Sequence, residues 1–201
     1  MIKRNLLVMG LAVLLSACGF QLRGTGTTEL TIKELDLSAR NAYGETVTQL
    51  RQVLEASGVK VYAGAPYKLY LADEQESQRI LSYAGAGRTG EYQVTTVLNY
   101  DIRGEHNLSL LSSKLEVQKV FIHDGNNLIG SDQEANDARK ESRRELVQRM
   151  MLRLQQLTPD QLQKLQQAAN DRAKAEADAL EAAQKAEAQT PRQSPLELPQ
   201  Q

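Results

Sequence analysis

Cys18 is the only cysteine of the 201-residue chain, and the residues before it determine what its thiol can do. Two basic residues, Lys3 and Arg4, precede an apolar run over residues 6–15, and small residues stand directly before the cysteine. A basic start, a short apolar run and a small-residue cut site are typical of a secretory signal peptide. We therefore predict that residues 1–17 are removed and that Cys18 becomes the first residue of the mature chain.

The tetrad Leu15-Ser16-Ala17-Cys18 resembles a bacterial lipobox, in which the thiol receives a diacylglyceryl group and the freed amine is acylated. Two other interpretations are a plain secretory signal beside a chance cysteine, and a membrane-spanning helix, which needs about 20 apolar residues. Lipidation of Cys18 predicts a domain tied to a membrane by its lipid anchor. Gly19 favours the periplasmic face of the outer membrane, because an Asp there tends to retain lipoproteins of enteric bacteria in the inner membrane. An acylated Cys18 leaves no thiol for a disulfide.

Residues 85–90, Gly-Ala-Gly-Arg-Thr-Gly, match the G-x-G-x-x-G motif of dinucleotide-binding loops. That chemistry needs a helix after the motif, so that the helix N-terminus faces a pyrophosphate. The segment after Gly90 instead shows the clearest strand pattern of the chain. We therefore predict a hairpin loop that binds no nucleotide, with Arg88 as either a solvated residue or a contact for an anionic partner.

The two histidines, His106 and His123, form no H-x-x-x-H or H-E-x-x-H spacing, so we predict no metal site. No G-x-S-x-G nucleophile elbow is present either. Since no acid, base and nucleophile converge, the sequence predicts a protein that is not an enzyme and holds no cofactor. The formal net charge of −1 also lacks the basic footprint of a nucleic-acid-binding protein.

Three stretches of different composition must position these residues. Residues 18–28 are typical of a flexible, lipidated tether, and residues 29–157 show the periodicities of one folded domain. Residues 158–201 are rich in Ala, Gln, Glu and Lys, which predicts a tail that is helical and then disordered.

The apolar pattern of residues 29–157 predicts the element order β-α-β-β-β-α. Strands are expected over residues 30–37, 66–83, 92–102 and 108–123, and helices over residues 43–54 and 131–157. The fold class is α+β, with two helices on one face of a four-stranded, mostly antiparallel sheet. The last helix should bury a stripe made of Ala135, Ala138, Ser142, Leu146, Val147, Met150, Met151, Leu154 and Leu157.

Three local patterns give sharper expectations. Ser131 and Glu134 predict a capping box at the start of the last helix, and Thr158-Pro159 predicts the start of a further helix. In the fourth strand the apolar phase changes between Val117 and Val120, which predicts a β-bulge near Lys119.

The block Cys18-Gly19-Phe20-Gln21-Leu22-Arg23-Gly24 is similar to the start of mature LPS-assembly lipoproteins of the LptE family. The segment Thr89-Gly90-Glu91-Tyr92-Gln93, which opens a strand after a glycine-containing loop, also resembles that family, and the resemblance covers about residues 18–157. It implies an outer-membrane lipoprotein that plugs and helps assemble the LptD β-barrel. It further implies binding of lipopolysaccharide and assistance in its delivery to the cell surface, with no enzymatic step.

The resemblance has one departure. Some members carry a basic residue early in the hairpin loop and another shortly before the last helix, both linked to lipopolysaccharide contact. Here these places hold Ala84-Gly85 and Ile129-Gly130-Ser131-Asp132, so those roles do not transfer and Arg88 is only a neighbouring candidate. Two other classes stay open, namely an envelope adaptor that uses the Ala-rich tail as a spacer and a small envelope hydrolase.

Overall fold

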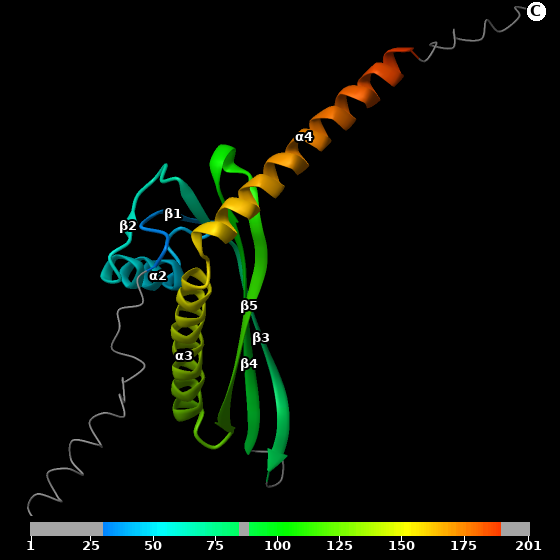
Figure 1. The fold of residues 1–201 in the computed structure, drawn as a ribbon. Helices are drawn as coiled ribbons and strands as arrows, with labels where there is room; N and C mark the ends of the chain where they lie inside the picture. Colours follow the sequence, from blue (N-terminus) through cyan, green and yellow to red (C-terminus); the bar gives the residue numbers. More distant parts are fainter. Residues whose placement is uncertain (1–29, 85–88, 190–201) are drawn as a thin grey trace, which may run out of the picture.

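The computed structural model describes residues 30–84 and 89–189 (Figure 1). The predicted signal peptide, Cys18, the tether, Arg88 and the end of the tail lie outside the described residues. The elements, in chain order, are β1 (Glu34–Ala39), α2 (Glu45–Ala56), β2 (Lys60–Val61), β3 (Tyr67–Ala84), β4 (Thr89–Arg103), the 3-10 turn η1 (Glu105–Asn107), β5 (Ser109–Asp124), α3 (Leu128–Gln155) and α4 (Pro159–Gln189).

The strands form one sheet in the order β2-β1-β3-β4-β5. β3, β4 and β5 are antiparallel, whereas β1 runs parallel to both β2 and β3. The α+β fold class is confirmed, but the sheet has five strands rather than four. The sequence pattern missed β2 because Lys60 and Val61 pair only with Glu34 and Leu35, and two residues are too few to show a period of two.

The helices α2 and α3 cover one face of this sheet, here called the inner face, and leave the outer face uncovered (Figure 1). Along β4 the buried side chains alternate as predicted, with Val94, Leu98 and Ile102 facing the helices. The main core joins Leu98 and Ile102 to α2 and α3 through Leu50, Leu54, Leu146, Met150 and Leu154. A smaller second core lies further along the sheet and is made of Tyr92, Val94, Phe121, Ala135 and Ala138.

The start of α3 differs from the prediction. Asn127 caps the helix by accepting a hydrogen bond from the backbone N–H of Gly130 (3.1 Å). Ser131 is buried within the first turns, where its hydroxyl accepts from the N–H of Asp124 (2.7 Å), and Glu134 accepts from the N–H of Ile122 (3.2 Å). The predicted capping box is therefore wrong, because both side chains bind the end of β5 instead.

The other helix signals are confirmed. The predicted stripe of α3 is buried from Ala135 to Leu157. At the start of α4, the hydroxyl of Thr158 accepts from the N–H of Gln161 (3.3 Å), and the Gln161 side chain accepts from the N–H of Thr158 (3.0 Å). This reciprocal pair satisfies two backbone donors that a helix start leaves free.

The predicted bulge near Lys119 is absent from the β4–β5 pairing. The register runs without a shift from Thr89↔Asp124 to Ile102↔Leu111, and the one shift in this described ladder falls between Ile102 and Arg103. The apolar phase changes for another reason. Val120 and Ile122 lie on the outer face, 56% and 54% exposed, while Phe121 fills the second core.

An ion-pair cluster ties the middle of β5 to α3. Lys119 Nζ lies 2.8 Å from a carboxylate oxygen of Glu145 and 3.0 Å from one of Glu141. Hydrogen bonds to Glu145 and Glu141 raise the pKa of Lys119. The hydrogen bond from Lys119, joined by one from Arg149, lowers the pKa of Glu145 against the opposing effect of partial burial.

We expect Glu145→Gln to lower the free energy of unfolding at pH 7 by about 0.5–1 kcal/mol. Because the folded-state pKa of Glu145 lies below its unfolded value of ~4.3, ionised Glu145 stabilises the fold above that value. The contribution is lost as the pH falls through the folded pKa. Urea denaturation of both proteins at pH 7 and pH 3 measures the difference, with Glu181→Gln in the exposed α4 pair as a control. A difference that stays constant with pH would contradict the assignment.

Candidate functional site

The predicted candidate Arg88 belongs to the connection between β3 and β4. Ala84 and Thr89, the described residues on either side, pair with each other, and the Thr89 hydroxyl donates to Asp124 (3.4 Å). The β3–β4 connection, the end of β5 and the start of α3 therefore share one end of the sheet, here called the distal end (Figure 1). Since β4 is a strand throughout, no helix follows the glycine motif and the dinucleotide chemistry has no helix N-terminus to use.

Packing at the distal end requires glycine at position 90. A Cβ built on Gly90 would lie 2.7 Å from the backbone oxygen of Ser82 and 3.4 Å from the ring of Tyr92. The ring of Tyr92 stacks in tilted contacts with Phe121 (5.7 Å between centroids) and with His123 (5.1 Å). The aromatic rings thus fill the inner side of the distal end, and His123 packs there as a half-buried edge residue.

Exposed apolar side chains surround this end of the molecule. They come from β3, β5 and the start of α3, and Ile129 is 86% exposed. Exposed apolar groups gathered on one region mark a contact site for protein or lipid more often than singly scattered ones. We name these residues the apolar rim, and its members are Ile80, Leu81, Tyr83, Val120, Ile122, Leu128 and Ile129.

The apolar rim is not predicted above, although two signals in the sequence point to it. One is the phase change of β5, which predicts a bulge but in the structure puts Val120 and Ile122 on the outer face. The other is the apolar pair Leu128-Ile129 at the start of a helix whose buried stripe begins later.

The outer face of the sheet carries an ordered row of polar side chains. Arg79 Nε donates to the side-chain oxygen of Gln93 (2.6 Å), and the Gln93 amide donates to Gln118 on β5. Gln118 donates in turn to Glu116 (2.8 Å). Gln93 is only 5% exposed although no described helix or loop covers this face, since its neighbours in the row bury it. The row joins β3, β4 and β5 into a preordered polar surface.

A second polar cluster lies nearer the other end of the same face. Burial of Asp101 opposes its ionisation, but hydrogen bonds from Ser109, Arg103 and Ser112 outweigh burial and hold the pKa of Asp101 below its ordinary value. The Arg103 guanidinium also lies over the ring of Tyr70, 5.0 Å from its centroid. This face is therefore mainly polar in its middle and toward Asp101, whereas Val120 and Ile122 expose apolar groups near the distal end.

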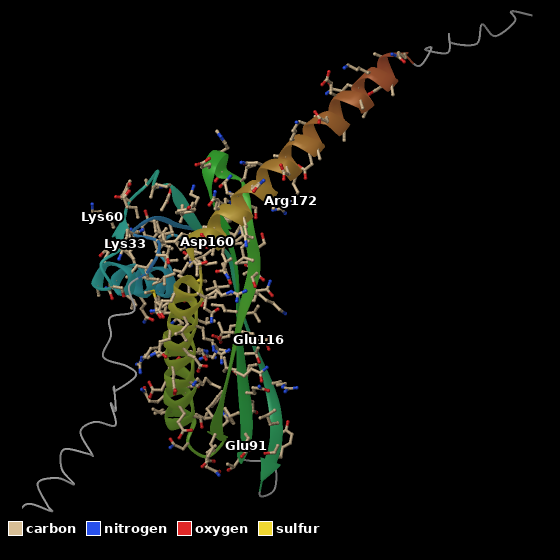
Figure 2. The ribbon with its side chains drawn as sticks, viewed as in Figure 1. Lys33, Lys60, Glu91, Glu116, Asp160 and Arg172 are labelled. Atoms are coloured by element: carbon tan, nitrogen blue, oxygen red, sulfur yellow. The ribbon has the colours of Figure 1, made fainter. Side chains whose placement is uncertain are left out.

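The distal end is not basic in the described part of the chain. Glu91 lies there (Figure 2), together with Asp124, Asp132 and Glu134, while Arg79 is the nearest cation on β3. Neither the apolar rim nor these acids would attract an anion. The predicted candidate for an anionic partner, Arg88, lies outside the described residues.

No group of three or more His, Cys, Asp and Glu side chains within residues 30–84 and 89–189 is arranged to hold a metal ion. None of the described helices is both long and apolar enough to cross a membrane.

A protein-family comparison matches residues 32–154 to LptE: Lipopolysaccharide-assembly. Among curated proteins, the LPS-assembly lipoprotein LptE of Pectobacterium atrosepticum is 29% identical over 155 residues, which cover 74% of this chain and 83% of that protein. The LptE of Photorhabdus laumondii is 28% identical over 153 residues, again 74% of this chain and 83% of the relative.

Solved structures share the fold at lower identity. The rare lipoprotein B of Shewanella oneidensis superposes with a TM-score of 0.55 at 20% identity, covering 60% of this chain and 92% of that one. Lipoprotein B of Nitrosomonas europaea gives a TM-score of 0.56 at 21% identity, covering 69% and 89%. The family match ends before α4, which begins at Pro159.

Gly90→Ala should destabilise the distal end, because the new methyl group would push against the Ser82 carbonyl and force β3 and β4 apart. We expect a loss of about 1–3 kcal/mol in the free energy of unfolding. Hydrogen exchange should show faster opening of amides around Tyr83 and Tyr92 than around Leu69 and Ile102, in the main core. Unchanged exchange at the distal end would show that the strands absorb the methyl group without cost.

Proposed function

This chain belongs to the LptE family of lipopolysaccharide-assembly lipoproteins, and from that premise we propose that it plugs the LptD β-barrel and helps that barrel assemble. The family makes the chain an envelope lipoprotein of lipopolysaccharide assembly. The proposal adds the outer membrane as its location, acylated Cys18 as its anchor on the periplasmic face, and LptD and lipopolysaccharide as its partners.

One observation carries the plug proposal, namely the uncovered polar face of the sheet. The interior of a large outer-membrane barrel is polar, so a protein inside it needs a polar surface without a wide apolar patch. The row Arg79-Gln93-Gln118 offers such a surface, with its side chains already ordered by mutual hydrogen bonds. An ordered surface loses less conformational entropy on binding than one whose side chains move freely.

The shape of the domain supports the same proposal. β4 pairs along its length with both β3 and β5. A strand of its 15 residues spans about 50 Å, which exceeds the ~25 Å height of the apolar band of an outer-membrane barrel. A long sheet backed by one layer of helices can therefore extend through a lumen and present its distal end beyond it.

The distal end is the proposed contact for lipopolysaccharide. Its apolar rim, above all Ile122, Leu128 and Ile129, offers hydrocarbon surface for acyl chains. Arg88 remains the proposed contact for a phosphate group, since a guanidinium matches phosphate geometry. The acyl chains and the phosphates of one lipid would then meet different parts of the same end.

The adaptor alternative has a specific observation in its favour, since α4 extends well beyond the sheet (Figure 1) and Leu180 is 61% exposed. An adaptor would need this extension to reach a second protein. The hydrolase alternative is not proposed, because nothing in the described residues favours it.

The plug proposal predicts that the full chain co-purifies with LptD from outer membranes and that its depletion lowers surface lipopolysaccharide. Deletion of residues 171–201 separates plug from adaptor, because the plug should keep both properties and the adaptor should lose surface lipopolysaccharide. Normal surface lipopolysaccharide after complete depletion of this protein would contradict the proposed function.

Replacing Leu128 and Ile129 together by Ser should weaken binding of lipopolysaccharide by the purified domain about tenfold, through loss of apolar contact area. Both side chains are exposed, so the melting temperature should stay within a few degrees. Arg88→Asp should weaken binding separately, and more strongly at low salt, where charge attraction is least screened. As a control, Leu180→Ser removes an exposed leucine from α4 and should leave binding unchanged. Equal lipopolysaccharide binding by the wild type, the Leu128/Ile129 double variant, Arg88→Asp and Leu180→Ser would rule out the distal end as the lipopolysaccharide contact.

A further inference from the structure

β3 has one free edge over most of its length. β1 pairs with it only from Tyr67 to Leu71, whereas β4 pairs with it from Lys68 to Ala84. Beyond Leu71 no other described segment pairs with β3 on the β1 side, and the side chains of residues 74–83 are all exposed. A row of backbone N–H and C=O groups is therefore open on that side.

The register identifies which backbone groups face the free edge. Leu71 O accepts a hydrogen bond from Arg40 N (3.0 Å), so the backbone of Leu71 faces the β1 side. A register shift follows between Leu71 and Asp73, and from there the antiparallel alternation carries every second residue to the free edge. These residues are Glu74, Glu76, Gln78 and Ile80. In the described part of the chain, no hydrogen bond from a side chain or from another segment reaches their backbone groups.

The opposite edge of the sheet is closed by side chains. On β5 the N–H of Ile122 donates to Glu134 (3.2 Å), and the carbonyl of Glu116 accepts from Arg149 Nη1 (2.6 Å). The carbonyl of Ser109 accepts from Arg172 of α4 (3.2 Å). Figure 2 labels Glu116, whose carbonyl accepts from Arg149, and Arg172, which donates to the carbonyl of Ser109. Helix side chains thus protect the β5 edge against another strand, while the β3 edge has no such protection.

The side chains along the free edge follow a definite order of charged and apolar groups. Between its two register shifts, β3 keeps regular pairing from Asp73 to Ile80. Three acids, Asp73, Glu74 and Glu76, stand in the first half, and Arg79, Ile80 and Leu81 stand at the far end. Glu76 is paired with Arg139 (2.7 Å) and Glu74 accepts from Thr46 (3.0 Å), so the acids keep free oxygen atoms for a further partner. A complementary strand would carry basic side chains opposite the acids and apolar ones opposite Ile80 and Leu81.

We propose that the β3 edge from Asp73 to Ile80 takes up an extended loop of the barrel partner as an added strand, and this inference rests on the proposed plug function. A wall strand of the barrel is not the occupant, because strands in a closed barrel have both edges paired. A loop that enters the lumen has free backbone groups and can form main-chain hydrogen bonds to Glu74, Glu76 and Gln78. Backbone pairing of this kind supplies affinity, and the side chains of alternate residues supply specificity.

Gln78→Pro tests the added strand in the full chain co-expressed with LptD. Proline removes the free N–H of residue 78 and leaves the hydrogen bonds to β4 in place, since the N–H points to the open side. We expect about tenfold weaker association with LptD than for the wild type. Lys114→Pro is the matched control, because Lys114 faces the protected edge of β5, opposite Asn99, and its loss should leave association unchanged.

Photocrosslinkers at positions 74, 76 and 78 of the otherwise unchanged chain give a second measurement that does not depend on how proline affects folding. Each should join LptD at alternate residues of one loop, in strand order. Crosslinks to barrel wall strands or to a second copy of this chain would overturn the proposal, as would undiminished association of a folded Gln78→Pro protein. In those cases wild-type co-purification with LptD would still stand. Failure of the wild type to co-purify would reject the plug function and the added strand together.

Discussion

The packing of the α3 stripe against β4 and β5 is the contact on which the rest of the fold depends. Leu146, Met150 and Leu154 are almost fully buried against strand residues such as Leu98 and Ile102. Each such side chain contributes about 1.5–3 kcal/mol relative to an exposed position. Without this layer, β3, β4 and β5 would be a long sheet exposed on both faces, which has too little apolar burial to hold its strands in register.

Toward the distal end, the side chains of this α3 stripe become smaller and less apolar. Ser142 and Thr96, both buried, place hydroxyl groups between the main core and the second core, where hydrocarbon packs elsewhere. Beyond them α3 presents Ala135 and Ala138, and the aromatic rings of the strands fill the space that these small residues leave. The distal end is therefore held by fewer large apolar contacts than the main core, and local opening costs less where such contacts are few. Under the proposed function, this difference would let the distal end adapt to a lipid.

Periodicity predicted most of the fold because burial on one face imposes it. The β4 alternation and the α3 stripe both survive in the structure, since a slip of one residue in either would expose several large side chains. The misses have a different origin. Ser131 and Glu134 match a capping box in sequence, yet the end of β5 supplies better partners for them through contacts that no local pattern encodes. Val120 and Ile122 break the expected pattern because their side chains lie on the exposed outer face rather than in the core. The free edge of β3 depends on where β1 stops, and only the pairing of distant segments decides that.

Under the proposed function, the main-core end of the sheet lies near the lipid anchor and the distal end lies away from it. Leu30, the first described residue, is buried in the main core, at the end of the sheet away from the apolar rim. The chain between Cys18 and Leu30 spans at most about 40 Å when extended. A lipid anchor in the periplasmic leaflet therefore holds the main-core end near that leaflet. In the proposed barrel the sheet would then extend away from that leaflet, and the apolar rim would be directed toward the cell surface. In the proposed arrangement the lipid would set the orientation, while the polar outer face and the open edge of β3 would supply the contacts that retain the domain in the barrel.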